Sequence, residues 1–130
     1  MTFDEYEKAA MRTADPTTQA KALTLSALGI CGEGGEFADL VKKHVFHEHQ
    51  LPYDKLKEEL GDILWYVTRA CNVLGTTLEI VAAGNVEKLR QRYPDGFSSE
   101  RSVNRIQRNE PCSVCGSTGY HRLSRPNRGY

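Results

Sequence analysis

The chain has 130 residues, enough for one ordinary domain and a tail, and its 17 basic and 17 acidic side chains balance overall. The charge is unevenly spread: residues 1–100 hold 11 Lys and Arg against 16 Asp and Glu, whereas residues 101–130 hold six arginines and one acid. No apolar run approaches the roughly 18 residues that span a bilayer, and the charged N-terminus lacks the apolar stretch of a signal peptide, so we expect a soluble cytoplasmic protein without a membrane partner.

The first two predicted elements are helices. One covers about residues 3–13, where Thr2 and Glu5 have the spacing of a capping box. The next runs from Gln19 or Leu23 to His47, after a polar stretch that interrupts the apolar periodicity.

Two further helices follow, and no strand is predicted. The third covers about residues 54–74, with apolar residues at helical spacing and Gly75 as its terminating residue. Thr76 and Glu79 have capping-box spacing and predict a fourth helix that ends before Pro94. Because the connections are short, neighbouring helices should be antiparallel, which predicts an all-α fold built from four helices.

The composition changes after residue 97, so we predict a helical domain over 1–97 and a basic, irregular tail over 98–130. The tail contains Cys112, Cys115 and His121, a set that resembles part of a structural zinc knuckle and could supply three of its four ligands. A reduced, unliganded cysteine pair fits equally well. The six arginines make the tail a candidate contact for nucleic acid, although an arginine-bearing disordered end is the commoner explanation of such composition.

Two pairs of acids at i, i+3 spacing are the main chemical signal. On a helical wheel Glu33 and Glu36 fall within the apolar face of the second helix, and Glu59 and Asp62 lie beside the apolar stripe of the third. Single pairs of this kind are common on solvated faces, but four converging carboxylates would repel one another unless a cation neutralised them. Oxygen-only ligands favour Mg²⁺ or Mn²⁺ over zinc, and the Glu-x-x-His motifs of a di-iron bundle are absent.

The first acid pair lies in the segment GEGGEF, residues 32–37, whose glycines are unusual inside a helix. Each interior glycine costs about 1 kcal/mol relative to alanine. We expect these glycines to let the backbone approach a neighbouring helix, or to leave room for a phosphate and its waters.

A set of phosphate-binding side chains is predicted on the fourth helix. Asn85, Lys88 and Arg92 are spaced i, i+3, i+7 and therefore lie along one side. Such a set is usually only a solvated face. Opposite a metal–carboxylate cluster it would serve as a phosphate clamp, because arginine, lysine and asparagine all donate to phosphate oxygens.

Three segments together resemble a known family. GEGGEF, KEELGDILWY (57–66) and NVEKLRQRYPDGF (85–97) are similar to the MazG-like nucleotide pyrophosphohydrolases of the all-α NTP pyrophosphatase superfamily, over about residues 3–105. The family motif pairs ExxE with a later ExxD, here Glu33-x-x-Glu36, 22 intervening residues, and Glu59-x-x-Asp62. One departure is Gly32, at a position where relatives often carry a further acid.

The resemblance implies a MazG-like four-helix bundle, completed by dimerisation, that hydrolyses a nucleoside triphosphate (NTP or dNTP) to monophosphate and pyrophosphate with Mg²⁺. It implies these site residues: Glu33, Glu36, Glu59 and Asp62 as metal ligands, Lys88 and Arg92 as catalytic cations, and Tyr66 near the substrate. Glu36 and Glu59 are also candidates for deprotonating the attacking water. The alternative is a non-catalytic MazG-like binding protein whose basic CxxC tail contacts nucleic acid or a protein.

Overall fold

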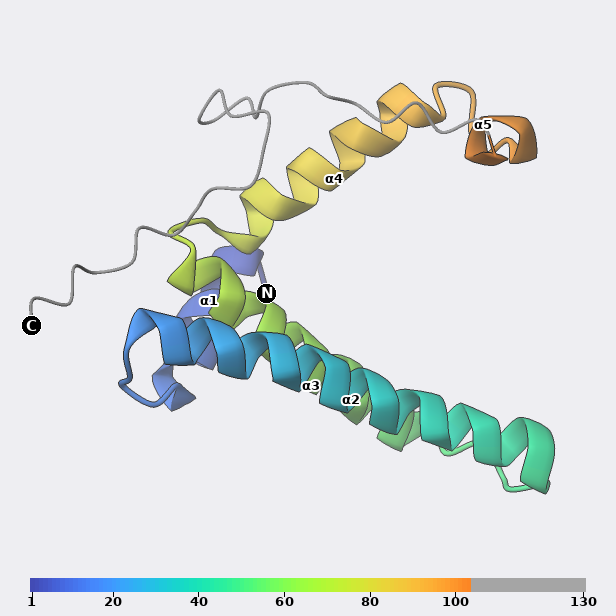
Figure 1. Ribbon diagram of the computed structural model, residues 1–130, viewed down its shortest axis with the longest axis horizontal. Coiled ribbons are helices and arrows are strands. Elements are labelled where there is room, and N and C mark those ends of the chain that lie inside the picture. The colour runs from blue at the N-terminus through green and yellow to red at the C-terminus, as the bar shows by residue number, and fades with distance from the viewer. Residues whose placement is uncertain (104–130) are drawn as a thin grey trace, which may run out of the picture. The chain divides into compact units, whose positions relative to one another are not determined.

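A computed structural model describes residues 1–103, and all regular structure in that range is helical (Figure 1). The elements in chain order are α1 (Phe3–Ala10), the 3₁₀ turn η1 (Met11–Thr13), α2 (Gln19–His47), α3 (Tyr53–Val73), α4 (Leu78–Arg92) and α5 (Ser99–Val103). The all-α prediction is thus confirmed for this part of the chain, while dimerisation stays a prediction.

The chain divides between Gln91 and Arg92 into two units. In the second unit, Ser98 Oγ accepts from the backbone N–H of Arg101 and caps α5. Residues 99–103 are therefore helical, contrary to the irregular tail expected from residue 98 onward. The predicted domain boundary after residue 97 stays a prediction. No helix among residues 1–103 combines the length and apolar character needed to cross a bilayer.

The beginning of α1 follows from a reciprocal cap. The Thr2 hydroxyl accepts from the N–H of Glu5 at 3.2 Å, and the Glu5 carboxylate accepts from the N–H of Thr2 at 2.7 Å, which confirms the predicted capping box. The α-helix ends at Ala10 rather than Thr13, because the last turn tightens into η1. Thr18 then caps α2, its hydroxyl accepting from the N–H of Lys21.

The junction between α3 and α4 differs from the prediction. Gly75 has a positive φ of 70°, and the N–H groups of Gly75 and Thr76 donate to the carbonyls of Asn72 and Cys71, which closes α3 in a Schellman motif. The predicted Thr76–Glu79 capping box is wrong. Thr76 belongs to the end of α3, and the cap of α4 is Thr77, whose hydroxyl accepts from the N–H of Ile80 at 3.2 Å.

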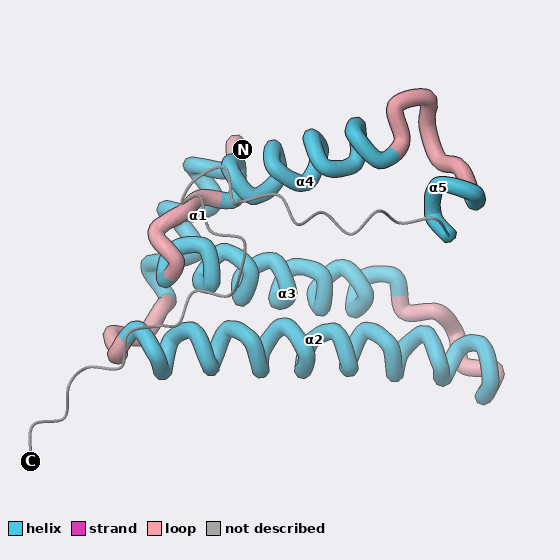
Figure 2. The backbone as a smooth tube through the Cα atoms, turned by 45° about the horizontal axis from the view of Figure 1, so that its top comes forward, coloured by secondary structure: helices cyan, strands magenta, loops and turns pink. Residues whose placement is uncertain are grey.

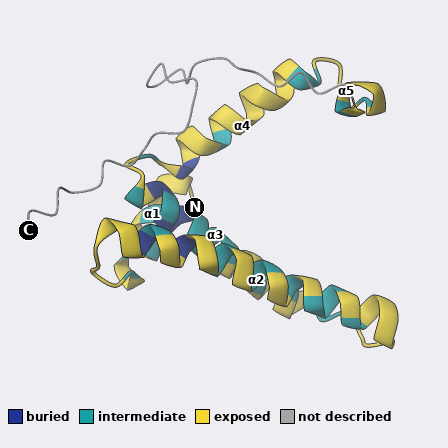
Figure 3. Cartoon of the chain, viewed as in Figure 1, coloured by how far each residue is buried: buried dark blue, intermediate teal, exposed yellow. Residues whose placement is uncertain are grey.

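Helices α2 and α3 form an antiparallel hairpin, and α1 packs against α3 (Figure 2). The buried residues of these elements gather near the α1 end of the hairpin (Figure 3). They are Ala22 and Ser26 on α2, Thr68, Arg69 and Cys71 on α3, and Leu78 at the beginning of α4. The remainder of the hairpin is half-buried or exposed within the single chain.

Polar contacts fasten the segment after α1 to α3. The indole N–H of Trp65 donates to the hydroxyl of Thr13 at 2.9 Å and to the carbonyl of Ala10 at 3.2 Å. Arg69 donates to the carbonyl of Asp15 at 3.2 Å, and its guanidinium lies 5.4 Å from the centroid of the Trp65 ring. In addition, the Glu7 carboxylate of α1 accepts from the N–H of Leu78, which joins α1 to the first residue of α4.

Candidate metal site between α2 and α3

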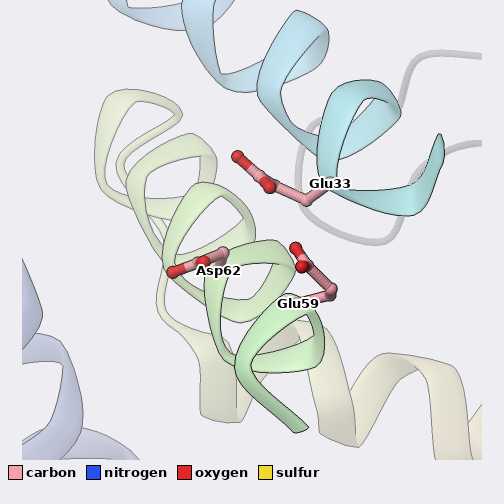
Figure 4. Close-up of side chains that lie close together, drawn as sticks. All are labelled: Glu33, Glu59 and Asp62. Atoms are coloured by element: carbon pink, nitrogen blue, oxygen red, sulfur yellow. The ribbon is translucent and has the colours of Figure 1, made fainter. Parts of the chain in front are cut away.

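Three of the four predicted metal ligands meet in the structure. Glu33 on α2 lies opposite Glu59 and Asp62 on α3, and one carboxylate oxygen from each lies within 4.8 Å of the others (Figure 4). Glu59 and Asp62 share one side of α3 because residues three apart are neighbours on a helix surface. Glu33 and Glu59 are half-buried and Asp62 is exposed. We call these three residues the acid cluster.

Glu36, the fourth predicted ligand, stands outside the acid cluster. A step of three residues turns it about 60° round α2 from Glu33, and its side chain is exposed. The sequence placed Glu36 within the apolar face of the second helix, but the structure exposes it, and its role as a metal ligand stays a prediction. Glu36 nonetheless acts on the cluster, because its charge contributes to the raised pKa of Glu33.

The electrostatics of the cluster favour a cation. Partial burial raises the pKa of Glu33 above its ordinary value, and the negative charges of Glu36, Asp62 and Glu59 raise it further. A hydrogen bond between Glu33 and Glu59 adds to the rise. Carboxylates that repel one another in this way gain from any cation that binds among them.

A residue outside the predicted site also lies near the acids. Burial and the charge of Asp62 raise the pKa of the Tyr6 phenol, so α1 brings a hydroxyl into the electrostatic range of the cluster. Tyr6 was not predicted from the sequence, because its only signal there is its place in a short amphipathic helix.

The glycines of GEGGEF make no close approach to a neighbouring helix within residues 1–103, and the alternative expectation, that they leave room for a phosphate, stays a prediction. A Cβ added at Gly32, Gly34 or Gly35 would meet no atom of residues 1–103 within 4 Å. The close approach occurs instead one turn earlier, at Gly29, where an added Cβ would overlap the ring of Tyr66. Tyr66 therefore packs against α2 beside the acid cluster.

The predicted phosphate-binding side chains lie on α4. Asn85 and Lys88 are exposed, and no ion pair joins Lys88 to an acid within residues 1–103. Arg92 is the first residue of the second unit, and its guanidinium lies 5.9 Å from the Tyr93 ring centroid. Cys112, Cys115 and His121 lie outside the described residues, and the zinc site stays a prediction from the sequence.

Comparison with known proteins identifies the family. The MazG nucleotide pyrophosphohydrolase domain matches residues 21–97, a range that contains the acid cluster, Glu36, Tyr66 and all of α4. The chain is also 33% identical over 114 residues to the Gene 37 protein of Mycobacterium phage L5, covering 81% of this chain and 100% of the phage protein. No solved structure gives a significant match. The match over residues 21–97 confirms the resemblance, and the chain belongs to the MazG nucleotide pyrophosphohydrolase domain family.

Proposed function

We propose that the chain is a nucleoside triphosphate pyrophosphohydrolase that uses Mg²⁺ or Mn²⁺ and acts on an NTP or dNTP in the cytoplasm. The observation that carries the proposal is the acid cluster, in which carboxylates from two helices of the matched domain converge within 4.8 Å. A bundle without a metal-dependent role would gain little from placing three like charges there.

The donor set suits a hard divalent ion. All three groups are carboxylates, and the oxygens of such groups are the ligands that Mg²⁺ and Mn²⁺ prefer. The exposure of Asp62 leaves part of the site open, as Mg²⁺ sites that bind substrate phosphates and several waters require. Glu36 is the proposed fourth ligand, because its exposed side chain can turn toward Glu33. A bound ion would shield the triphosphate charges and lower the pKa of a coordinated water.

The remaining roles belong to the side chains. Glu59, or alternatively Glu36, accepts the proton of the water that attacks at the α–β phosphoanhydride; the bridging P–O bond breaks and pyrophosphate leaves. Lys88 and Arg92 stabilise the negative charge that develops on the leaving pyrophosphate, and Asn85 donates its amide to a phosphate oxygen. Tyr66 contributes one side of the substrate site.

The direct test is Glu59→Gln, which keeps the shape of the side chain and removes its charge. We expect the helical circular dichroism to be unchanged and Mg²⁺-dependent pyrophosphate release to fall roughly 100-fold or more. Glu58→Gln is the matched control, since Glu58 is the adjacent acid, is exposed and stands outside the acid cluster. Full turnover by Glu59→Gln would refute the assignment.

The same assay separates the enzyme from a binding protein. A panel of NTPs and dNTPs, assayed for pyrophosphate with Mg²⁺ and with EDTA, should show metal-dependent release from at least one nucleotide. No release from any of them, together with salt-dependent nucleic-acid binding that is lost on deleting residues 101–130, would instead establish the non-catalytic alternative.

We also propose that the functional unit is a homodimer. Several large apolar side chains of α2, α3 and α4 are exposed in the part of the chain that the structure describes. Among them are Leu25, Leu28, Leu60, Ile80, Val81, Val86 and Leu89. A second copy of the chain would bury such side chains and complete the bundle.

A further inference from the structure

Gly29 of α2 packs against the Tyr66 ring of α3 so closely that any side chain at position 29 would overlap the ring. An added Cβ would lie less than 3.0 Å from Cγ, Cδ1 and Cε1 of Tyr66. A Cβ added at the other glycines of the hairpin, at 32, 34, 35 and 61, would meet no atom within 4 Å in the described part of the chain. The missing side chain at residue 29 therefore leaves room for the Tyr66 ring, whereas the neighbouring glycines have no such contact.

The ring of Tyr66 cannot simply step aside. Cγ is bonded directly to the Tyr66 Cβ, so moving it requires a different χ1 rotamer or a shift of α3. The ring also meets Trp65 edge-on, with the centroids 5.0 Å apart at 89°. Trp65 is fixed in turn by its hydrogen bonds to Thr13 and Ala10. The Tyr66 ring thus lies between the α2 backbone and the hydrogen-bonded indole of Trp65.

The contact lies one helical turn from the acid cluster. Glu33 follows Gly29 by four residues, and Asp62 precedes Tyr66 by four residues, each a step of about 6 Å along its helix. Because α2 and α3 are antiparallel, these steps run in the same direction in space (Figure 2). The Gly29–Tyr66 contact and the Glu33–Asp62 pair are therefore consecutive levels of one helix–helix interface.

We infer that Gly29 is a positioning residue for the metal site. Because residue 29 has no side chain, the Tyr66 ring packs directly on the α2 backbone, and this contact sets the distance between α2 and α3. At that distance Glu33 can reach a metal shared with Glu59 and Asp62. This inference rests on the proposed function. Mg²⁺–oxygen distances of about 2.1 Å require ligand oxygens about 3 to 4 Å apart. The oxygens now lie within 4.8 Å, so even a small widening of the interface would take Glu33 out of reach.

The test measures Mn²⁺ binding to the full chain without nucleotide, by electron paramagnetic resonance. We expect Gly29→Ala to weaken Mn²⁺ binding about 10- to 100-fold, as changes behind a ligand shell commonly do. Gly84→Ala is the matched control, because its Cβ meets nothing within 4 Å and the residue lies on α4. At saturating Mn²⁺, Gly29→Ala should recover most of its turnover number, whereas Glu59→Gln should not.

A double variant shows whether the effect passes through the ring. Tyr66→Ala removes all three overlapping carbons, so Gly29→Ala added to it should change Mn²⁺ affinity by no more than about twofold. The inference would be overturned if Gly29→Ala left the Mn²⁺ affinity unchanged. It would also be overturned if Gly29→Ala lowered that affinity equally in the unaltered chain and in Tyr66→Ala.

The double variant also decides the case in which Gly29→Ala alone fails to fold. A folded double variant that binds Mn²⁺ like Tyr66→Ala supports the inference, and one that binds about tenfold more weakly overturns it. If the unaltered chain neither binds Mn²⁺ nor releases pyrophosphate, the proposed function itself is wrong. Metal binding and turnover in the unaltered chain, with no effect of Gly29→Ala, would overturn only the positioning role.

Discussion

Arg69 is the residue whose environment departs furthest from its ordinary preference. It is only 4% exposed, and no carboxylate forms an ion pair with it within residues 1–103. A buried charge is costly unless its donors are satisfied. Here the carbonyl of Asp15 and the face of Trp65 take that role, so a single cation attaches the segment after α1 to α3.

We therefore expect Arg69→Ala to lower the free energy of unfolding by about 2 to 4 kcal/mol, because it removes the hydrogen bond and the ring contact and leaves a cavity. Urea unfolding followed by circular dichroism measures this change. Arg12→Ala, at an exposed arginine of η1, is the control and should change the stability by less than about 0.5 kcal/mol. Equal changes in the free energy of unfolding for the two substitutions would show that the buried contacts of Arg69 do not stabilise the fold.

At the same scale, the sequence predicted which acids lie together better than it predicted the side-chain contacts around them. The spacing of Glu33, Glu59 and Asp62 was enough to bring them together once the two helices formed a hairpin. The packing of Tyr66 against Gly29 depends on the rotation of α3 about its axis, which the sequence pattern does not specify. The place of Tyr6 depends on how α1 lies on α3, which no periodicity specifies.

Among the elements, the helices with strong periodicity were predicted most accurately. The bounds of α2 agree with the prediction, and α3 differs by one residue at each end. The errors lie where local hydrogen bonds compete. Thr76 and Thr77 are adjacent and both suit a cap, but the N–H of Thr76 is already used to close α3. The short helix α5 has too few residues to show a period.

The end of α3 provides a matched test of backbone conformation. Gly75 has a φ of 70°, where a side chain is strained, whereas Gly84 lies inside α4 with no atom near an added Cβ. Gly75→Ala should lower the free energy of unfolding by about 1 to 2 kcal/mol. Gly84→Ala should raise it by up to about 1 kcal/mol, since alanine favours the helix. Urea unfolding distinguishes the opposite signs, and a stabilising Gly75→Ala would contradict the Schellman motif.

For the whole molecule, the single chain has a small core. Its only buried hydrophobic residues within residues 1–103 are Ala22, Cys71 and Leu78, and none of them is large apart from Leu78. At the same time Leu28 of α2 is 67% exposed and Ile80 of α4 is 60% exposed. A domain of this size normally buries such side chains, and the proposed homodimer would bury them.

This imbalance predicts that folding and association are coupled. Sedimentation equilibrium should find a dimer, and the thermal midpoint should rise with protein concentration, because association stabilises the folded chain by mass action. Leu28→Glu puts a charge on the exposed apolar surface and should give a monomer with a lower, concentration-independent midpoint. Lys55→Glu introduces the same residue at an exposed polar position of α3 and should leave the dimer intact. A monomeric, fully active unaltered chain would show instead that the acid cluster of one chain suffices for hydrolysis and that its exposed apolar side chains have another use.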